Sequence, residues 1–380
     1  MRDSQLVMEA VASQADELHR LGQFLWDNPE TAFKEEKAHE YLTDLLEKQG
    51  FRVQRNYCLP TAFRAEYGDG GPVVTLLCEY DALPGLGHAC GHNLIAMSSV
   101  GAGIAVKAAL EADVSLRGKV APINVLALVP MTGKFDGVLV LPFGQPQCRS
   151  MRQHPLSASQ IKAVFHGKSA HASLAPWEGL SALDAAVGAY VNISMLRQRM
   201  KPSWRVHGTP VGSAAKSTKC AEEREVNWGN RQTTHDIFFQ LSVLLLCCSQ
   251  CKATAWFFSN TSTKRSPVNI FLQLNFSPNR PFSNFATRKG ITFEDSEPGQ
   301  FVATGVTSDI GNIAHRLPCI HPVFGIVTAG KNHSSEFNEA TGTLQSREKA
   351  LTIARVLALT VLDVLRDTAV LDAIRDEFRA

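Results

Sequence analysis

Two histidines and a cysteine lie within five residues of one another, at His88, Cys90 and His92. They follow the apolar run PVVTLLC, which is typical of a short buried strand, and they belong to the glycine-rich sequence GLGHACGHN. Thiolate and imidazole are good ligands for a borderline-soft divalent ion such as zinc, and glycines let the backbone fold tightly around it. The stretch therefore indicates a metal site, although buried histidine and cysteine also serve as hydrogen-bonded core groups.

The segments that would position this stretch alternate between strand and helix. The sequences GPVVTLLC (71–78) and INVLALV (123–129) are typical of short buried strands, and residues 94–112 between them have a helical pattern. Apolar residues at helical spacing predict two amphipathic helices before these strands, one in residues 1–26 and one in 35–50. This alternation predicts an α/β sheet.

A second domain is predicted to begin near residue 158. The strand-like run ASQIKAVFHGKSAHAS precedes a helical stretch, residues 179–200, whose Leu180, Leu183, Ala186 and Val187 share one face. Residues 209–283 show no sustained helical or strand period, so we expect an irregular tract there. The apolar stripe of residues 346–367 predicts a helix that returns to cover the first sheet.

Composition excludes several classes of protein. With 380 residues, 44% of them hydrophobic, the chain can build two domains. A net charge of +2, from 38 basic and 36 acidic residues, gives no basic field for nucleic acid. Residues 237–248 are too few to span a bilayer, so no membrane association is expected. The amino terminus lacks the pattern of a signal peptide, and the nine cysteines are expected to be thiols or ligands, so a cytoplasmic location is expected.

The sequence EYDALPGLGHACGHNLIA resembles the metal-binding signature of the M20 metallopeptidase and amidohydrolase family, in its amidohydrolase-like branch (subfamily D) with a cysteine ligand. The resemblance continues through SAHASLAPWEGLSALDAAVGAYVNISMLRQRMKPSWRVHG. It resumes in TSDIGNIAHRLPCIHPVFGI and KNHSSEFNEATG. In all it covers residues 1–128, 151–208 and 285–380, most of the chain.

This resemblance implies a two-domain α/β protein. A catalytic α/β/α domain would comprise residues 1–157 and 285–380, and residues 158–284 would form an inserted ferredoxin-like α+β lid that commonly mediates dimerisation. The resemblance also implies a centre of two divalent ions per chain, usually zinc or manganese. Such a centre hydrolyses an amide or peptide bond in a small substrate such as a dipeptide, with metal-activated water.

The family's site residues carry over onto five positions. Cys90 and His92 match the ligands of the CGH motif, His154 matches the ligand before the lid, and His333 matches the distal ligand. Asp81 matches a carboxylate that orients one of the ligands.

Four other polar residues of the motifs receive no metal. His88 and Asn93 belong to the signature without a ligand role. His171 resembles a lid residue that contacts substrate, but an ordinary turn residue is an equally good interpretation. His207 resembles a lid histidine that polarises the scissile carbonyl, but an ordinary strand residue is an equally good interpretation.

One catalytic element of the family is absent. The family has two adjacent glutamates, a general base and a metal ligand, after the second strand, whereas residues 124–150 contain no glutamate and one carboxylate, Asp136. Hydrolysis needs a group that takes the proton of the attacking water, so the general base is unassigned, and Asp136 is the candidate carboxylate to complete the centre. The irregular tract 209–283 stands where the lid should continue.

Three interpretations stay open. The chain is an active hydrolase, or it is an inactive member of the family, or its sequence is damaged at two exon boundaries. In the last two cases it keeps the fold and at most binds a metal or a small peptide. An acidic residue near Cys90, His92 and His154 in the fold would favour the enzyme, and a site lined only by these ligands would favour the inactive member. A thiol hydrolase with Cys90 as nucleophile and His92 as base is weaker, because the two are so close in sequence.

Overall fold

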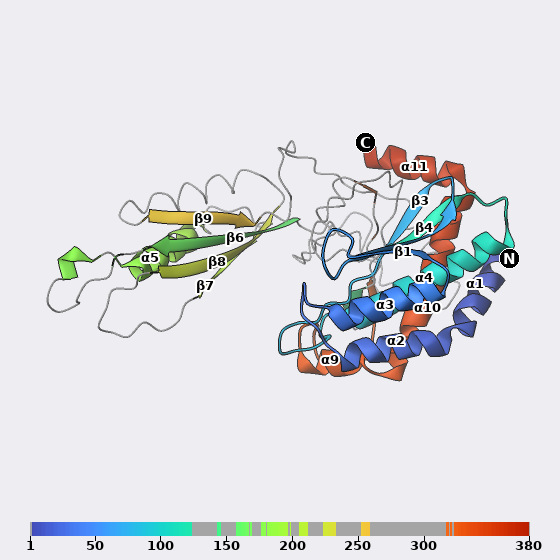
Figure 1. Cartoon of the computed structure of the whole chain (residues 1–380), viewed down its shortest axis with the longest axis horizontal. Coiled ribbons are helices and arrows are strands. Elements are labelled where there is room, and N and C mark those ends of the chain that lie inside the picture. Colours follow the sequence, from blue (N-terminus) through green and yellow to red (C-terminus); the bar gives the residue numbers. More distant parts are fainter. Residues whose placement is uncertain are drawn as a thin grey trace. The chain divides into compact units, whose positions relative to one another are not determined.

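The computed structural model describes residues 2–123, 143–145, 157–166, 168, 176–179, 181–196, 198, 205–211, 223–232, 252–258, 317–318, 320 and 323–379 (Figure 1). The chain forms two compact units. The first contains Met1–Gln153, Leu272–Val302 and Ile313–Ala380, and the second contains His154–Phe271 and Ala303–Asn312. Both ends of the chain thus contribute to the first unit.

The chain opens with three helices, α1 (Arg2–Ser13), α2 (Ala15–Asp27) and α3 (Glu36–Lys48). The prediction of a single helix in residues 1–26 was wrong. The Ser13 hydroxyl donates to the carbonyl of Ala10 at 2.9 Å, and Gln14 leaves the helical region with φ −107° and ψ 6°. Such local side-chain bonds compete with helix continuation, which explains the break.

A four-stranded sheet forms the centre of the first unit. Its strands are β1 (Arg52–Arg55), β2 (Phe63–Asp69), β3 (Val73–Leu77) and β4 (Gly118–Ile123), in the order β1-β2-β4-β3. Strands β3 and β4 are parallel, and α4 (His92–Ala112) connects them as the predicted helix. This confirms the strand–helix–strand prediction as far as residue 123, and residues 124–129 lie outside the described residues.

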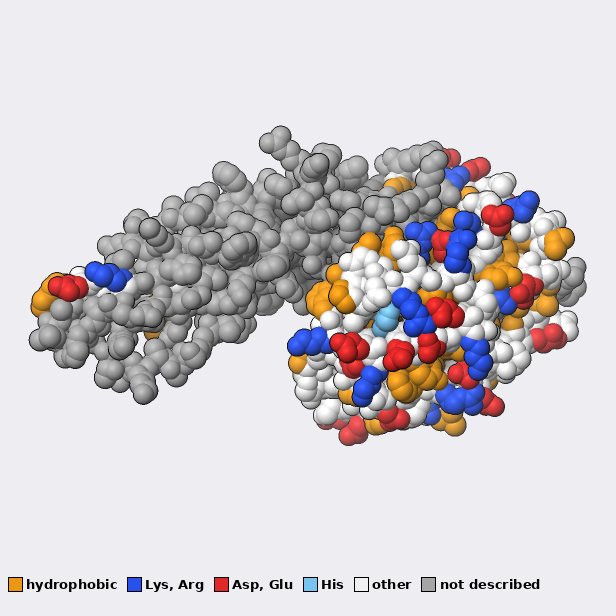
Figure 2. All heavy atoms as spheres, in the orientation of Figure 1, with side chains coloured by type: hydrophobic (Ala, Val, Ile, Leu, Met, Phe, Trp, Pro, Cys, Tyr) orange, Lys and Arg blue, Asp and Glu red, His pale blue; other side chains and the backbone are white. Residues whose placement is uncertain are grey.

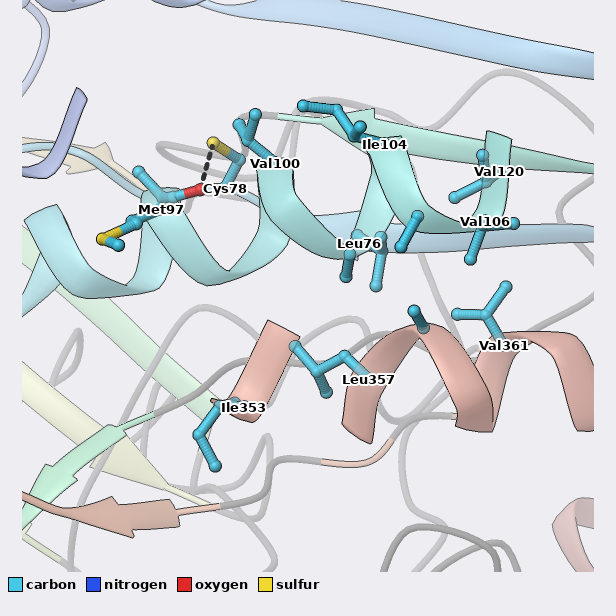
Figure 3. Packing of buried hydrophobic residues seen from close by; sticks show 14 of the residues in the cluster. Leu76, Cys78, Met97, Val100, Ile104, Val106, Val120, Ile353, Leu357 and Val361 are labelled. Atoms are coloured by element: carbon cyan, nitrogen blue, oxygen red, sulfur yellow. Dashed lines mark hydrogen bonds between the residues drawn. The ribbon is translucent and has the colours of Figure 1, made fainter. Parts of the chain in front are cut away.

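The carboxy-terminal helix α10 (Leu344–Arg366) packs against α4, as predicted for the returning apolar stripe. Figure 3 shows Leu357 and Val361 of α10 directed toward α4 and toward Leu76 of β3. The backbones approach closely because Gly101 of α4 has no side chain: a Cβ there would lie 3.1 Å from that of Ala354. The shorter helices α9 (Ser335–Thr341) and α11 (Thr368–Arg379) flank α10.

Helix α4 is long and apolar enough to cross a membrane by length and composition. However, 89% of its most apolar window is buried inside the protein, so within the described part of the chain it serves as a core helix. Figure 2 shows acidic and basic side chains interspersed over the face of the first unit turned toward the viewer.

A second four-stranded sheet forms in the second unit. Strands β6 (Ser157–His166), β7 (Arg205–Val211), β8 (Glu223–Gln232) and β9 (Lys252–Phe258) are all antiparallel, in the order β7-β8-β6-β9. The predicted strand after residue 158 is confirmed. The expectation of an irregular tract at 209–283 was wrong for β8 and β9, because pairing with β6 forms strands that the polar sequence alone does not indicate.

Helix α5 (Ala182–Leu196) lies between β6 and β7 in the chain, as expected, but its buried face differs from the predicted one. Leu183 and Val187 are 44% and 48% exposed, whereas Ala182, Ala186 and Ala189 are buried. Small residues allow the helix to approach its sheet closely, so the larger apolar side chains stay outside. In the first unit, β5 (Phe143–Gln145) and β10 (Val323–Gly325) form a separate parallel pair.

The packing of α10 predicts unequal effects for two equal truncations. Leu357→Ala removes a fully buried side chain and should lower the free energy of unfolding by about 2–5 kcal/mol. Leu344→Ala, at a position that is 58% exposed, should change it by no more than about 0.5 kcal/mol. Urea denaturation followed by circular dichroism measures both, and equal effects would contradict the packing described.

Candidate metal centre

The segment after β3 sends alternate side chains to opposite sides. Cys78 and Tyr80 are buried in the core, and the Cys78 N–H continues the sheet by donating to the carbonyl of Ile123 at 2.9 Å. Glu79 and Asp81 lie two residues apart, so their side chains, 13% and 16% exposed, leave the extended chain on the same side. Two carboxylates therefore emerge together at the carboxyl end of the strand.

A tight turn brings His92 back to these carboxylates. Gly91 precedes α4 with a φ of +82°, a left-handed conformation that favours glycine, and its carbonyl accepts from the N–H of Ile95 at 3.1 Å. Cys90 and His92 thus stand on either side of a sharp change in chain direction. This is the tight backbone path that the glycines in the sequence indicated.

Asp81 holds the imidazole of His92. Nδ1 of His92 lies 2.7 Å from Oδ1 of Asp81 and 2.9 Å from its carbonyl oxygen. Because both partners only accept, Nδ1 must be the donor. The other ring nitrogen, Nε2, lies 3.3 Å from Oε2 of Glu79. Asp81 therefore fixes the orientation of the His92 ring and turns Nε2 toward Glu79, and its role in orienting a metal ligand stays a prediction.

Charge and burial adjust the protonation of this cluster. Burial alone would lower the pKa of His92, but Asp81 and Cys90 raise it well above its usual value. Burial raises the pKa of the Cys90 thiol, yet His92 and hydrogen bonds from His333 and His92 lower it to about 6. At neutral pH Cys90 is therefore mainly a thiolate beside a protonated His92, which is the ionised form that binds metals.

His333 reaches the cluster from the other end of the chain. It lies between β10 and α9, with a φ of +68°, and its N–H donates to the carbonyl of Ala89 at 2.9 Å. The side chain of Asn93 donates to the carbonyl of Thr341 at 3.0 Å, which fixes the end of α9 to the start of α4. The structure therefore brings Cys90, His92 and His333 together, as the resemblance implied.

His88 and Asn93 belong to the framework of the site. His88 is 1% exposed, and its Nε2 lies 2.8 Å from the carbonyl oxygen of Leu25. Burial, with the charge of His92 as the second cause, lowers the pKa of His88 to about 4, so it is neutral at physiological pH. The hydroxyl of Thr341 donates to the carbonyl of His88 at 3.3 Å. These contacts give the two polar residues His88 and Asn93 a structural role without a metal.

The donor set suits a zinc-type ion in its chemistry. It offers a thiolate, two imidazoles and nearby carboxylates, and the ring nitrogen of His92 away from the ion is already held by a carboxylate. In the described part of the chain, no group of three or more His, Cys, Asp or Glu side chains is placed so that it could hold a metal ion. The protonated His92 instead bonds to its neighbours, and a metal ion would replace that proton.

Several predicted residues lie elsewhere. His154, Asp136 and His171 fall outside the described residues. His207 lies in β7, opposite Gly229 of β8. Cys90 and His92 interact electrostatically across the turn at Gly91, and the prediction that they are too close in sequence for an ordinary nucleophile and base arrangement stays a prediction.

The sequence analysis missed Glu79. The signal was present, because the alternation of Cys78, Glu79, Tyr80 and Asp81 continues the period of the preceding strand and places Glu79 beside Asp81. An acidic residue, Glu79, therefore lies beside His92, and His154, which the prediction also named, lies outside the described residues.

Comparisons with known proteins show which proteins this chain is similar to. No family model matches the chain. The Xaa-Arg dipeptidase of Mus musculus is 34% identical over 400 residues, which cover 98% of this chain and 91% of the relative.

Two solved structures share the fold. An aminohydrolase of methicillin-resistant Staphylococcus aureus has a TM-score of 0.67 and 17% identity, and covers 96% of this chain and 100% of its own. A dinuclear metal-binding peptidase of the M20 family from Bacillus subtilis has a TM-score of 0.57 and 18% identity, and covers 93% of this chain and 99% of its own. Their α/β architecture agrees with the predicted fold class. The relationship to the dipeptidase over nearly the whole length shows that this chain belongs to the M20 family of metallopeptidases and amidohydrolases.

Proposed function

We propose that this chain is a metal-dependent dipeptidase that hydrolyses the peptide bond of a small substrate. The observation that carries the proposal is the pair of carboxylates around His92: Asp81 at 2.7 Å from Nδ1 and Glu79 at 3.3 Å from Nε2. Protonated His92 compensates these two largely buried charges in the structure, and a divalent ion bound beside His92 would compensate them in the same way.

Cys90, His92 and His333 would hold the metal, with His154 as the fourth ligand implied by the resemblance. A bound ion would act as a Lewis acid on the scissile carbonyl and lower the pKa of a water molecule. The thiolate and imidazoles favour zinc over manganese, which prefers oxygen ligands. Asp81 keeps the imidazole of His92 in one tautomer and orientation, so that the same nitrogen always faces the ion.

The substrate class follows from the relative. The mouse protein is named an Xaa-Arg dipeptidase, and this chain spans 91% of its length. We therefore propose dipeptides with a carboxy-terminal arginine as substrates. The contact between the Cys90 thiolate and His92 supports one rival, a thiol hydrolase that needs no metal.

The exposed side of α5 supports a homodimer through the second unit. Leu183, Val187, Val191 and Met195 recur at helical spacing and are 44%, 48%, 46% and 59% exposed. An apolar stripe of this kind is unusual on a face that contacts only water. A second copy of the chain, presenting the same stripe, would cover it by a two-fold contact.

Hydrolysis of Xaa-Arg dipeptides tests the catalytic proposal. The full chain, supplied with zinc or manganese, should release free arginine, and a chelator should abolish the release until metal is returned. Asp81→Asn should lower the rate about 10–100-fold, because a neutral amide can still orient the His92 ring but does not raise its basicity as the carboxylate does. Release that survives the chelator but stops after alkylation would support the thiol hydrolase, and no release would support an inactive member.

Light scattering tests the dimer. Val191→Glu places a charge in the apolar stripe of α5 and should halve the mass in solution. Val114→Glu makes the same change at a residue that is 90% exposed in the first unit, and it should leave the mass unchanged. A monomeric wild-type chain, or a dimer that tolerates Val191→Glu, would contradict the proposed interface.

A further inference from the structure

Glu35 is a buried carboxylate to which the proposed reaction assigns no role. It is 0% exposed and accepts two hydrogen bonds, from the N–H of Phe33 to Oε1 at 2.8 Å and from the hydroxyl of Thr61 to Oε2 at 2.7 Å. Burial raises the pKa of Glu35, whereas these two donors lower it and so stabilise the ionised carboxylate. Glu35 therefore joins two loops, one that follows α2 and one that connects β1 to β2.

The loop after α2 contains a residue in a strained conformation. The N–H of Lys34 donates to the carbonyl of Thr31 at 3.0 Å, which closes a four-residue turn. Phe33, the third residue of this turn, has a φ of +68°, which glycine favours and bulky residues rarely adopt. Such conformations persist where the surroundings impose them. Because Phe33 is 53% exposed, the bond from its N–H to Glu35 is a main contact that holds it.

The same loop is fastened to the residue that follows Asp81. Thr31 pairs with Ala82 in a parallel bridge, and the N–H of Ala82 donates to the carbonyl of Glu30 at 2.7 Å. The turn at residues 31–34 begins at this bridge, so its conformation fixes the main chain next to Asp81.

The loop between β1 and β2 is fastened to the residue that precedes Asp81. The hydroxyl of Tyr80, which is 1% exposed, donates to the carbonyl of Thr61. Nδ1 of His39, on α3, lies 3.1 Å from the same carbonyl oxygen. Both neighbours of Asp81 are thus anchored to loops that Glu35 joins through its two carboxylate oxygens.

We propose that Glu35 is a positioning residue for Asp81. By bonding to Phe33 and Thr61 it locks the two loops together, and these loops hold the main chain on either side of Asp81 so that its carboxylate meets Nδ1 of His92. The proposal rests on the proposed function, because Asp81 serves the reaction only through His92. It assigns Glu35 no contact with substrate or metal.

Nuclear magnetic resonance of the full chain tests this arrangement. Glu35→Ala should speed hydrogen exchange of the Ala82 N–H about 10-fold, because the loop that accepts its bond opens more often. It should also weaken the downfield signal of the proton that Nδ1 of His92 donates to Asp81. Exchange of the Val100 N–H, in the buried part of α4, should stay unchanged and show that the core is intact.

Two further variants separate a positioning role from general destabilisation. Glu35→Gln keeps the shape, and its amide can accept from the Phe33 N–H and donate to the Thr61 hydroxyl, so both signals should return to wild-type behaviour. Glu36→Ala removes the adjacent carboxylate, which is exposed, and should change neither signal. If Glu35→Gln behaves like Glu35→Ala, or if Glu36→Ala has the same effect, the proposal is overturned.

A milder change serves if Glu35→Ala does not fold. Thr61→Val keeps the size of the side chain and removes one of the two donors to Glu35. It should weaken the His92 Nδ1 proton signal in the same direction, and an unchanged signal would overturn the proposal.

The outcomes also separate this proposal from the proposed function. With an active wild type, Glu35→Ala should lower kcat for an Xaa-Arg dipeptide about 10-fold and leave KM nearly unchanged, and Glu35→Gln should restore it. Unchanged proton signals in a folded Glu35→Ala that still hydrolyses the dipeptide would overturn the positioning role alone. Signals that depend on Glu35 in a wild type without hydrolysis would support the positioning of Asp81 and contradict the dipeptidase.

Discussion

The contact between Asp81 and His92 is the interaction on which the site depends. It joins the end of a strand to the first residue of α4, and it fixes the proton on Nδ1 so that Nε2 points toward Glu79. Burial lowers the pKa of His92, and the same contact opposes this effect and raises the pKa. The resulting positive charge stabilises the Cys90 thiolate. The orientation of the His92 ring and the charge that stabilises the Cys90 thiolate therefore both depend on the Asp81 carboxylate. Its position follows from the alternation of side chains in the extended segment after β3.

The site also requires that the two ends of the chain meet. His333 comes from a segment that β10 and α9 position, and its main chain bonds to Ala89 next to Cys90. Asn93 and His88 fasten α9 to the start of α4, and behind them α10 packs along α4 through Gly101 and Ala354. The core of the first unit thus serves as the support that keeps a distant histidine at the cluster.

The sequence predicted the parts of the fold that depend on local pattern. Helices α4 and α10 and strand β3 have long or continuous apolar signals, and the assignment of Cys90, His92 and His333 as metal ligands, which the resemblance implied, stays a prediction. Strands β8 and β9 were missed because their formation depends on pairing with β6, and no local period encodes that pairing. The outer face of α5 was misjudged because alanines, and not the larger Leu183 and Val187, pack inward. The alternation of residues 78–81 was enough to predict that Glu79 lies on the same side as Asp81. The contact of Glu79 with His92 could not be predicted, because it depends on the turn at Gly91.

X-ray absorption spectroscopy of the full chain loaded with one zinc ion tests the central claim, that Cys90 and histidines from both chain ends form a metal centre. The account predicts one sulfur at about 2.3 Å and nitrogen or oxygen neighbours at about 2.0–2.1 Å. The sulfur should disappear in Cys90→Ser. A shell without sulfur, or one whose sulfur persists in Cys90→Ser, would contradict it.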